Sequence, residues 1–153
     1  MSDFGSGVGG GGGGGVVAGP RASFGTRFLA ALIDGVLIGV VALVFRLLLG
    51  ALLGSGVQLL LGLAYYAYLE GSPSGQTIGK RAMSIRVVDF NGGGPIGTGR
   101  GLLRYVGRIV SSIPCGLGYF WMLWDSEKQT WHDKIATTVV VPTSAYPVAA
   151  WPG

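Results

Sequence analysis

Residues 28–49 read FLAALIDGVLIGVVALVFRLLL, and this stretch decides what kind of fold the chain can adopt. As a helix it would be roughly 33 Å long, which is enough to cross a hydrocarbon core of about 30 Å. Arg46 lies near one end, where its side chain can reach the lipid headgroups. Asp34 lies about two turns from the other end and has no such route. The stretch, which begins at about Arg27, predicts a transmembrane helix with one costly acidic residue.

The composition also indicates a membrane protein. Of the 153 residues, 49% are hydrophobic and 12% are charged, which is about half of the roughly 25% charge of soluble globular chains. The net charge of +4 suits either nucleic acid or an anionic membrane surface. Because the basic residues flank hydrophobic runs and no nucleic-acid-binding module is recognisable, we expect the lipid bilayer and not nucleic acid as the partner.

Two further apolar segments follow the first. One covers about residues 54–70, and the glycine-rich link at 50–56 predicts a tight antiparallel turn before it. The other covers about residues 102–124 and is interrupted at Pro114 and Gly116. We therefore predict an all-α membrane protein, in which a transmembrane helical hairpin is joined by a third hydrophobic helix that is broken or re-entrant.

The remaining segments are polar or rich in glycine. Residues 1–21, with their glycine run, predict a disordered tail, and residues 142–153 a short C-terminal tail. Two strand-like runs, residues 85–89 and 137–141, would leave unpaired backbone groups if isolated, so we expect them to form a short two-stranded cytoplasmic β pair. Such a pair keeps both ends of the third element on one side, which favours a re-entrant element over a crossing one.

The distribution of basic residues predicts the orientation. Lysines and arginines near the hairpin lie before it and after it, and the link inside the hairpin has none. These flanking residues are Arg21, Arg27, Lys80, Arg81, Arg86 and Arg100. Since basic residues close to membrane spans stay in the cytoplasm, we expect the N-terminus and the central loop there.

Asp34 supports two interpretations. An ionisable side chain within a membrane helix costs at least about 2.5 to 3.5 kcal/mol on insertion scales, so it has either a role or a partner. The functional interpretation is a carboxylate that binds a proton or a cation. The structural interpretation is a fixed ion pair with Arg104, Arg108 or Arg27, and three available cations favour it.

The other motifs give weaker signals. Gly35 and Gly39 form a Gly-x-x-x-Gly pair that would allow close helix packing. The segment from Gly75 to Lys80 has three residues between its glycines, not the four of a phosphate-binding loop, and so does not predict nucleotide binding. His132 lacks further metal ligands, and we expect the His132–Asp133 pair to cap a short segment. We expect no catalytic, cofactor-binding or metal-binding residue, no cofactor and no enzyme activity.

The chain resembles the RDD family of small bacterial integral membrane proteins, which is named for an arginine and two aspartates. Arg27 and Asp34 in RFLAALID and Asp133 in QTWHDKIATTVV carry the resemblance. The family's central loop is matched by Gly75, Gln76, Thr77, Gly79 and Lys80, and its basic third segment by Arg104 and Arg108. The resemblance covers about residues 22–141 and implies a multi-pass protein of the bacterial plasma membrane.

Two functions follow from these observations. The first is a non-catalytic accessory or scaffold subunit of a membrane complex, whose partners are other membrane subunits or further copies of the chain. The alternative is a cation (sodium)/proton antiporter that works as a homo-oligomer, because the resemblance links some family members to exchange of cations for protons. In that case Asp34 would handle the ion, with Arg27 and Asp133 beside it.

Overall fold

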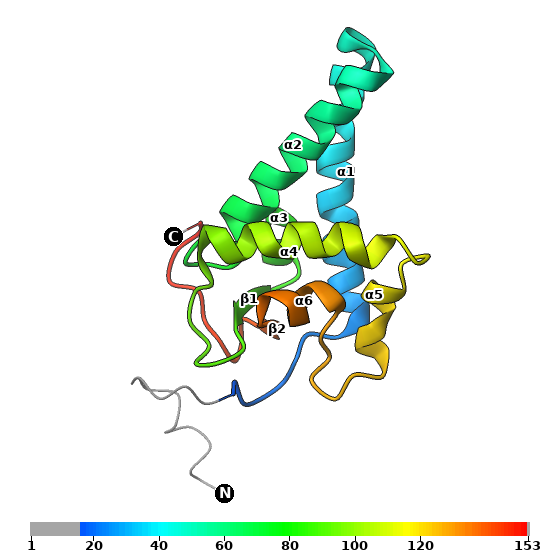
Figure 1. Ribbon diagram of the computed structural model, residues 1–153. Helices are drawn as coiled ribbons and strands as arrows, with labels where there is room; N and C mark the ends of the chain where they lie inside the picture. Colours follow the sequence, from blue (N-terminus) through cyan, green and yellow to red (C-terminus); the bar gives the residue numbers. More distant parts are fainter. Residues whose placement is uncertain (1–15, 153) are drawn as a thin grey trace, which may run out of the picture.

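The computed structural model describes residues 16–152, so most of the predicted glycine-rich tail lies outside the described residues. The fold is mostly helical with one small sheet, as predicted (Figure 1). In chain order the elements are α1 (Phe24–Leu49), α2 (Ala51–Glu70), α3 (Ile78–Ala82), β1 (Ile85–Asp89), α4 (Gly97–Ser112), α5 (Leu117–Phe120), the 3₁₀ turn η2 (Trp121–Leu123), α6 (Trp131–Ala136) and β2 (Thr138–Pro142).

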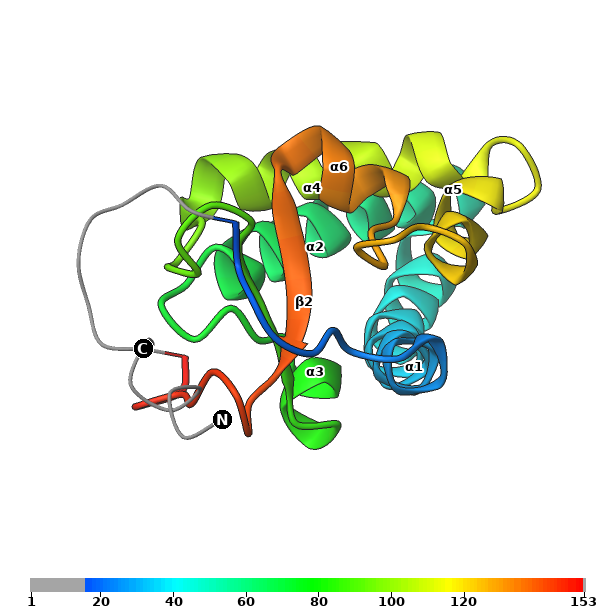
Figure 2. The same cartoon turned by 90° about the horizontal axis from the view of Figure 1, so that it is seen from below.

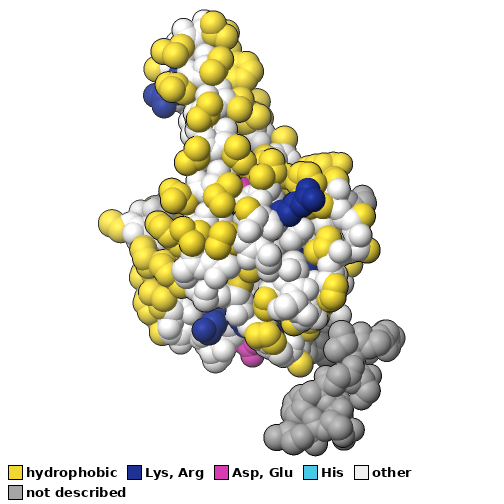
Figure 3. Space-filling view, turned by 180° about the vertical axis from the view of Figure 1, so that it is seen from behind, with side chains coloured by type: hydrophobic (Ala, Val, Ile, Leu, Met, Phe, Trp, Pro, Cys, Tyr) yellow, Lys and Arg dark blue, Asp and Glu magenta, His cyan; other side chains and the backbone are white. Residues whose placement is uncertain are grey.

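The helices α1 and α2 form the predicted hairpin, which projects from the rest of the protein (Figure 1). Helix α1 begins three residues earlier than predicted because the Ser23 side chain accepts a hydrogen bond from the Thr26 backbone N–H and caps the helix. Gly50 has a φ of +87° and reverses the chain directly into α2. Both helices are long and apolar enough to cross a membrane. Hydrophobic side chains dominate the projecting hairpin on the face seen in Figure 3.

Helix α4 lies across the base of the hairpin (Figure 1). Its apolar side faces outward. Its buried face consists of Gly101, Arg104, Gly107, Arg108 and Ser111. Its exposed large apolar residues are Leu102, Leu103, Val106, Ile109 and Val110, and Ile113 at its C-cap is exposed as well. A surface helix of a water-soluble protein has the opposite arrangement, with its apolar stripe toward the core. The outer face of α4 is therefore suited to a non-aqueous environment.

The third hydrophobic element, predicted over about residues 102–124 with an interruption, consists of several separate helical elements in the structure. Helix α4 starts five residues earlier, at Gly97, and ends at Ser112. The predicted interruption is confirmed, because Gly116, with a φ of +76°, precedes the short helix α5. Left-handed backbone of this kind cannot continue an α-helix, which explains why the element breaks here.

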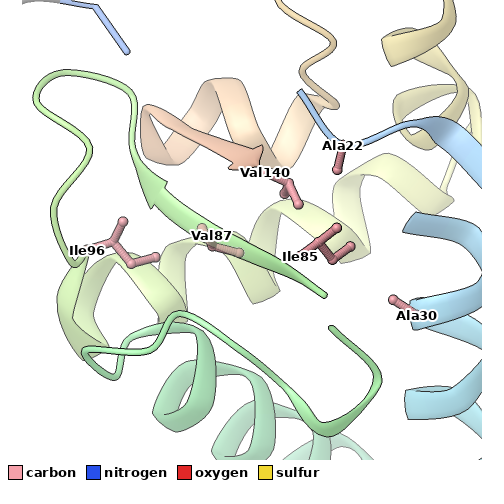
Figure 4. Close-up of a cluster of buried hydrophobic side chains, with 6 residues drawn as sticks. All are labelled: Ala22, Ala30, Ile85, Val87, Ile96 and Val140. Atoms are coloured by element: carbon pink, nitrogen blue, oxygen red, sulfur yellow. The ribbon is translucent and has the colours of Figure 1, made fainter. Parts of the chain in front are cut away.

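The two predicted strands pair with each other. Strands β1 and β2 are antiparallel, with Ile85 opposite Pro142 and Asp89 opposite Thr138. One face of the pair packs into an apolar cluster that includes Ala30 of α1 (Figure 4). The full cluster is Ala22, Ala30, Ile85, Val87, Ile96 and Val140. The chain thus leaves the sheet after β1, passes through α4 to α6, and returns to the same sheet.

Both segments predicted as tails contribute contacts. Val17 is buried and its backbone N–H donates to the backbone carbonyl of Phe90 at 2.8 Å, so the end of the segment predicted as a disordered tail packs against the fold. Figure 2 shows this segment running beside β2 toward α1. At the other end, the Trp151 indole N–H donates to the backbone carbonyl of Gln76 at 3.0 Å. The domain predicted over residues 22–141 therefore extends on both sides.

Candidate functional site

A network of charged side chains fills the interior where α1, α2, α3, α4 and α6 meet. Its acids are Asp34, Glu70 and Asp133, and its bases are Arg27, Lys80, Arg104 and Arg108. Every acid has 0% of its surface exposed. Four bases against three acids give an excess of one positive charge. Buried charges of this number are costly unless each finds a partner.

Glu70, the last residue of α2, binds three cations. Its carboxylate accepts from Lys80 Nζ at 2.7 Å and from Arg104 Nε at 2.8 Å, and Arg108 Nη2 also donates to it. The Arg108 guanidinium lies over the Tyr66 ring, 4.1 Å from its centroid. Glu70 thereby joins α2 to both α3 and α4.

Asp133 forms the second centre of the network. Its carboxylate pairs with Arg27 Nη1 at 2.8 Å and with Arg104, which therefore bridges Glu70 and Asp133. Asp133 Oδ2 also accepts from the Thr130 backbone N–H at 3.0 Å, which completes a capping box at the start of α6. The prediction that the His132–Asp133 pair caps this segment holds only for Asp133, which is the third helical residue of the capping box, whereas the N-cap is Thr130.

Asp34 takes no part in these ion pairs. Its Oδ1 accepts from the Tyr65 hydroxyl at 2.6 Å and from the Gly79 backbone N–H at 2.8 Å. Its Oδ2 accepts from the Thr77 hydroxyl at 2.6 Å. Within residues 16–152 no cationic group lies within 4.0 Å of it. The predicted pair of Asp34 with an arginine was wrong.

The reason is competition from other acids. Glu70 binds Arg104 and Arg108, and Asp133 binds Arg27 and Arg104, so all three candidate arginines are already paired. Asp34 is instead satisfied by neutral donors from α2 and from the loop before α3. Three hydrogen bonds stabilise a buried carboxylate without an adjacent cation.

The central loop motif has a docking role in the structure. Thr77 caps α3 and Gly79 donates to Asp34, while Lys80 reaches Glu70. A Cβ on Gly79 would overlap the carbonyl oxygen of Ala30 and lie 2.8 Å from Asp34 Oδ1, so only glycine fits. The side chain of Gln76 donates to the carbonyl of Ile85 at 3.0 Å. Gly75 is equally constrained, because it has a φ of +63° and a Cβ there would overlap the carbonyl oxygen of Val87.

Comparison with known proteins shows where this architecture belongs. The model of the RDD family matches residues 21–137, which is most of the chain. This chain belongs to the RDD family. Of the three residues that carried the resemblance, Arg27 and Asp133 form a salt bridge, whereas Asp34 binds the central loop. The family and the two apolar helices together indicate a membrane protein.

Relatives occur in several bacteria. The chain is 40% identical over 99 residues to the proline-rich antigen homolog of Mycobacterium tuberculosis (strain H37Rv), covering 60% of this chain and 41% of that protein. It is 40% identical over 77 residues to the proline-rich antigen of Mycobacterium leprae, covering 50% of this chain and 30% of that protein. It is 26% identical over 147 residues to the uncharacterized protein YxaI of Bacillus subtilis, covering 78% and 96%.

The chain thus spans about two fifths or less of the length of these mycobacterial relatives. No solved structure matches it.

Glu70 was not identified from the sequence as a member of the charged network. Glu70 follows directly on an apolar run, so it marked the end of a helix and not a binding position. The charge count contained the signal, because Arg104 and Arg108 lie four residues apart on one helix face and need an acid opposite them. Lys80 was identified with the central loop, but its pairing with Glu70 was not anticipated.

A cavity of about 300 Å³ lies beside the network, between α1, α4 and the segment from Gly116 to Met122. The described polar residues that line it are Arg27, Lys80, Arg108, Tyr119, Thr130 and His132. The apolar lining comes from Phe24, Phe28, Ala31, Phe120 and Met122. The cavity therefore combines a basic wall with an aromatic one.

His132 is buried in this wall and predicts a pH-dependent stability. Burial lowers the pKa of His132 well below its usual range; Asp133 opposes this effect and Arg108 adds to it. The folded chain thus keeps the imidazole neutral, while the unfolded chain protonates it below about pH 6.5. Since the unfolded state binds the extra proton, stability is complete above that pH and falls as the pH drops below it.

We expect His132→Gln to flatten this dependence by up to ~1.4 kcal/mol per pH unit below about pH 6.5. The amide side chain introduced by this substitution would retain a polar partner for Thr130, whose hydroxyl lies 3.0 Å from His132 Nε2. The measurement is the free energy of unfolding in mild detergent at a series of pH values. Equal slopes for the variant and the parent protein would show that His132 is not the titrating group.

Proposed function

We propose that this RDD protein is a non-catalytic membrane subunit that assembles with other membrane proteins or with further copies of itself. The proposal rests on one contrast in the structure. In the charged interior every acid is paired with a base or hydrogen-bonded, so no acid is left to act on a substrate. The outer surface of the hairpin, in contrast, exposes apolar side chains and glycines that contact no other part of the described chain.

The inverted amphipathicity of α4 supports insertion in the bilayer. Its outward residues, such as Val106, Ile109 and Ile113, are 49%, 44% and 76% exposed. At roughly 25 cal/mol per Å² of apolar surface, contact with lipid in place of water would stabilise this face substantially. We propose that the hairpin crosses the bacterial plasma membrane and that α4 lies in it without crossing.

The paired strands support this arrangement. Because β1 and β2 are hydrogen-bonded to each other, both ends of the segment from α4 to α6 lie at one sheet. Lys80, Arg81 and Arg86 lie in or directly before β1, and no basic residue lies between Arg46 and Lys80. The positive-inside rule then favours a cytoplasmic sheet and central loop.

Gly35 and Gly39 offer a contact surface for a partner helix. A Cβ added to either glycine would meet nothing within 4 Å, so the Gly-x-x-x-Gly face of α1 is not used inside the chain. In lipid, helices associate through such small residues, because the backbones can approach closely. An accessory or scaffold role accounts for a helix face of this kind.

The test is to purify tagged protein from its native membrane in mild detergent and to identify stoichiometric partners by mass spectrometry. We expect a defined complex that the double variant Gly35→Leu/Gly39→Leu weakens at least about tenfold, the effect of losing ~1.4 kcal/mol of helix packing. Gly56→Leu is the matched control, because Gly56 is also exposed on the hairpin with no neighbour within 4 Å. A lone monomer, or a complex unaffected by the double variant, would contradict the proposal.

The alternative, cation/proton exchange at Asp34, has less geometric support. An ion-carrying carboxylate needs to be free of a fixed cationic partner, and Asp34 has none within residues 16–152. However, each of its oxygens already accepts a short hydrogen bond from a hydroxyl. The interior also carries an excess of positive charge, which disfavours entry of a second cation. Sodium-driven proton movement in vesicles that Asp34→Asn abolishes would nevertheless favour exchange over a scaffold role.

A further inference from the structure

We propose that the cavity beside the charged network binds the headgroup of an anionic phospholipid, with the acyl chain leaving past the phenylalanines of α1 and α5. The inference goes beyond the proposed assembly and shares with it only the membrane location. It rests on three features of the cavity: its charge, its unused hydrogen-bond donors and its apolar mouth.

The charge of the cavity selects an anion. Arg27, Lys80 and Arg108 all line it, and none of the described lining residues is acidic. Glu70 and Asp133 lie behind these cations and offset them only in part, because the whole network keeps one positive charge in excess. A single negative charge, such as that of a phosphodiester, would balance the network. Guanidinium groups suit phosphate oxygens particularly well.

Several donors in the cavity wall lack an acceptor. Lys80 Nζ makes one hydrogen bond to the described residues, although an ammonium group has three donors. The guanidinium donor Arg108 Nε is buried and has no partner within residues 16–152, and neither has the imidazole nitrogen His132 Nδ1, which donates in only one of its two tautomers. Arg108 is only 9% exposed and His132 only 2%. Buried polar atoms are nearly always paired, so unpaired donors in a basic cavity wall suit a ligand that is rich in acceptors.

The entrance of the cavity is lined by aromatic side chains, which favour contact with a hydrocarbon chain. The Phe24 ring lies 6.2 Å from that of Phe28 and 5.6 Å from that of Phe120, measured between centroids. Phe28 and Phe120 are 56% and 45% exposed and join the apolar outer surface of α1. A free inorganic phosphate would use the basic wall only. A phospholipid uses both walls.

The position of the cavity agrees with a headgroup site. It adjoins the first turns of α1, at the end of the hairpin opposite its tip at Gly50. In the proposed orientation this end faces the cytoplasmic leaflet, whose anionic lipids attract basic side chains. The volume of about 300 Å³ is at the lower end of the range of small-molecule sites and suits a headgroup better than a whole lipid.

The test is native mass spectrometry of the full chain in detergent with equimolar phosphatidylglycerol and phosphatidylcholine, which differ in charge and share acyl chains. We expect the phosphatidylglycerol adduct to exceed the phosphatidylcholine adduct by about tenfold, as one charge-assisted contact would give. Ala31→Phe should abolish this preference, because residue 31 lines the cavity without belonging to the charged network. Val36→Phe is the control, since Val36 is an exposed residue of α1 that does not line the cavity.

The outcomes separate the possible ligands. Equal adducts of the two lipids, or a preference that survives Ala31→Phe, would overturn the proposal. If equimolar inorganic phosphate displaced phosphatidylglycerol, the acyl chain would not contribute to binding. If equimolar oleate displaced it, the phosphate group would not contribute. Because the same spectra report the oligomeric state, failure of the proposed assembly is seen independently. Gly35→Leu/Gly39→Leu should keep the lipid preference.

Discussion

Replacing Glu70 by alanine is expected to destabilise the protein more than any other single loss of charge. The change leaves Lys80, Arg104 and Arg108 buried without the carboxylate that all three contact. Breaking one buried pair costs about 3–5 kcal/mol, because an uncompensated charge remains. We expect a loss at the upper end of that range, measured as the free energy of unfolding in mild detergent with increasing dodecyl sulfate.

Glu127→Ala is the matched control for this experiment. Glu127 also pairs with an arginine, Arg21, at 2.6 Å, but its side chain is 40% exposed. The Arg21 side chain is 8% exposed but also donates to the backbone carbonyls of Val17 and Gly19, so it keeps acceptors when Glu127 is lost. We therefore expect a loss of about 1 kcal/mol or less, as for a partly exposed pair. Similar effects of the two substitutions would mean that the interior is open to water and that Glu70 is not the centre of a dry network.

Gly79→Ala is expected to cause the second large loss of stability, although it adds a single methyl group. The new Cβ would overlap the carbonyl oxygen of Ala30 and press on Asp34, so α3 must move away from α1. That movement would break the hydrogen bonds from Gly79 and Thr77 that satisfy the buried Asp34 carboxylate. Overpacking costs about 1–3 kcal/mol, and a carboxylate with lost donors adds about 1–3 kcal/mol.

Gly99→Ala separates this steric effect from helix propensity. Gly99 lies in α4, is exposed, and has nothing within 4 Å of an added Cβ. Since alanine favours a helix by up to about 1 kcal/mol over glycine, this variant should be as stable as the parent protein or more so. If Gly79→Ala were equally harmless, the loop would have to adapt freely, and its contact with Asp34 would not be a fixed part of the fold.

The architecture could be predicted from the sequence wherever one local pattern determined it. The run at 28–49, the turn at Gly50 and the break at Gly116 each have a local cause, and each is present in the structure. The pairing of β1 with β2 was also predictable, because short isolated strands leave backbone groups without partners. Element boundaries were less accurate, since caps such as Ser23 lie outside the hydrophobic pattern.

The partners within the charged network could not be predicted in the same way. The presence of Asp34, Arg104 and Arg108 indicated a buried ion pair, and a network of such pairs does exist. The assignment failed because pairing depends on which acid each arginine reaches, and Glu70 and Asp133 lie far apart in the sequence although Arg104 contacts both. Such distances are set by the three-dimensional fold and not by the spacing along the chain.

The paired strands and the bridging Arg104 also constrain the order in which the protein can be completed during synthesis. Arg27 leaves the ribosome long before its partner Asp133, and β1 long before β2. Until residue 133 has emerged, the nascent chain has a complete hairpin but an α4 whose Arg104 lacks one of its two acidic partners. We therefore expect α4 to reach its final position at the base of the hairpin late in synthesis, after the hairpin has formed.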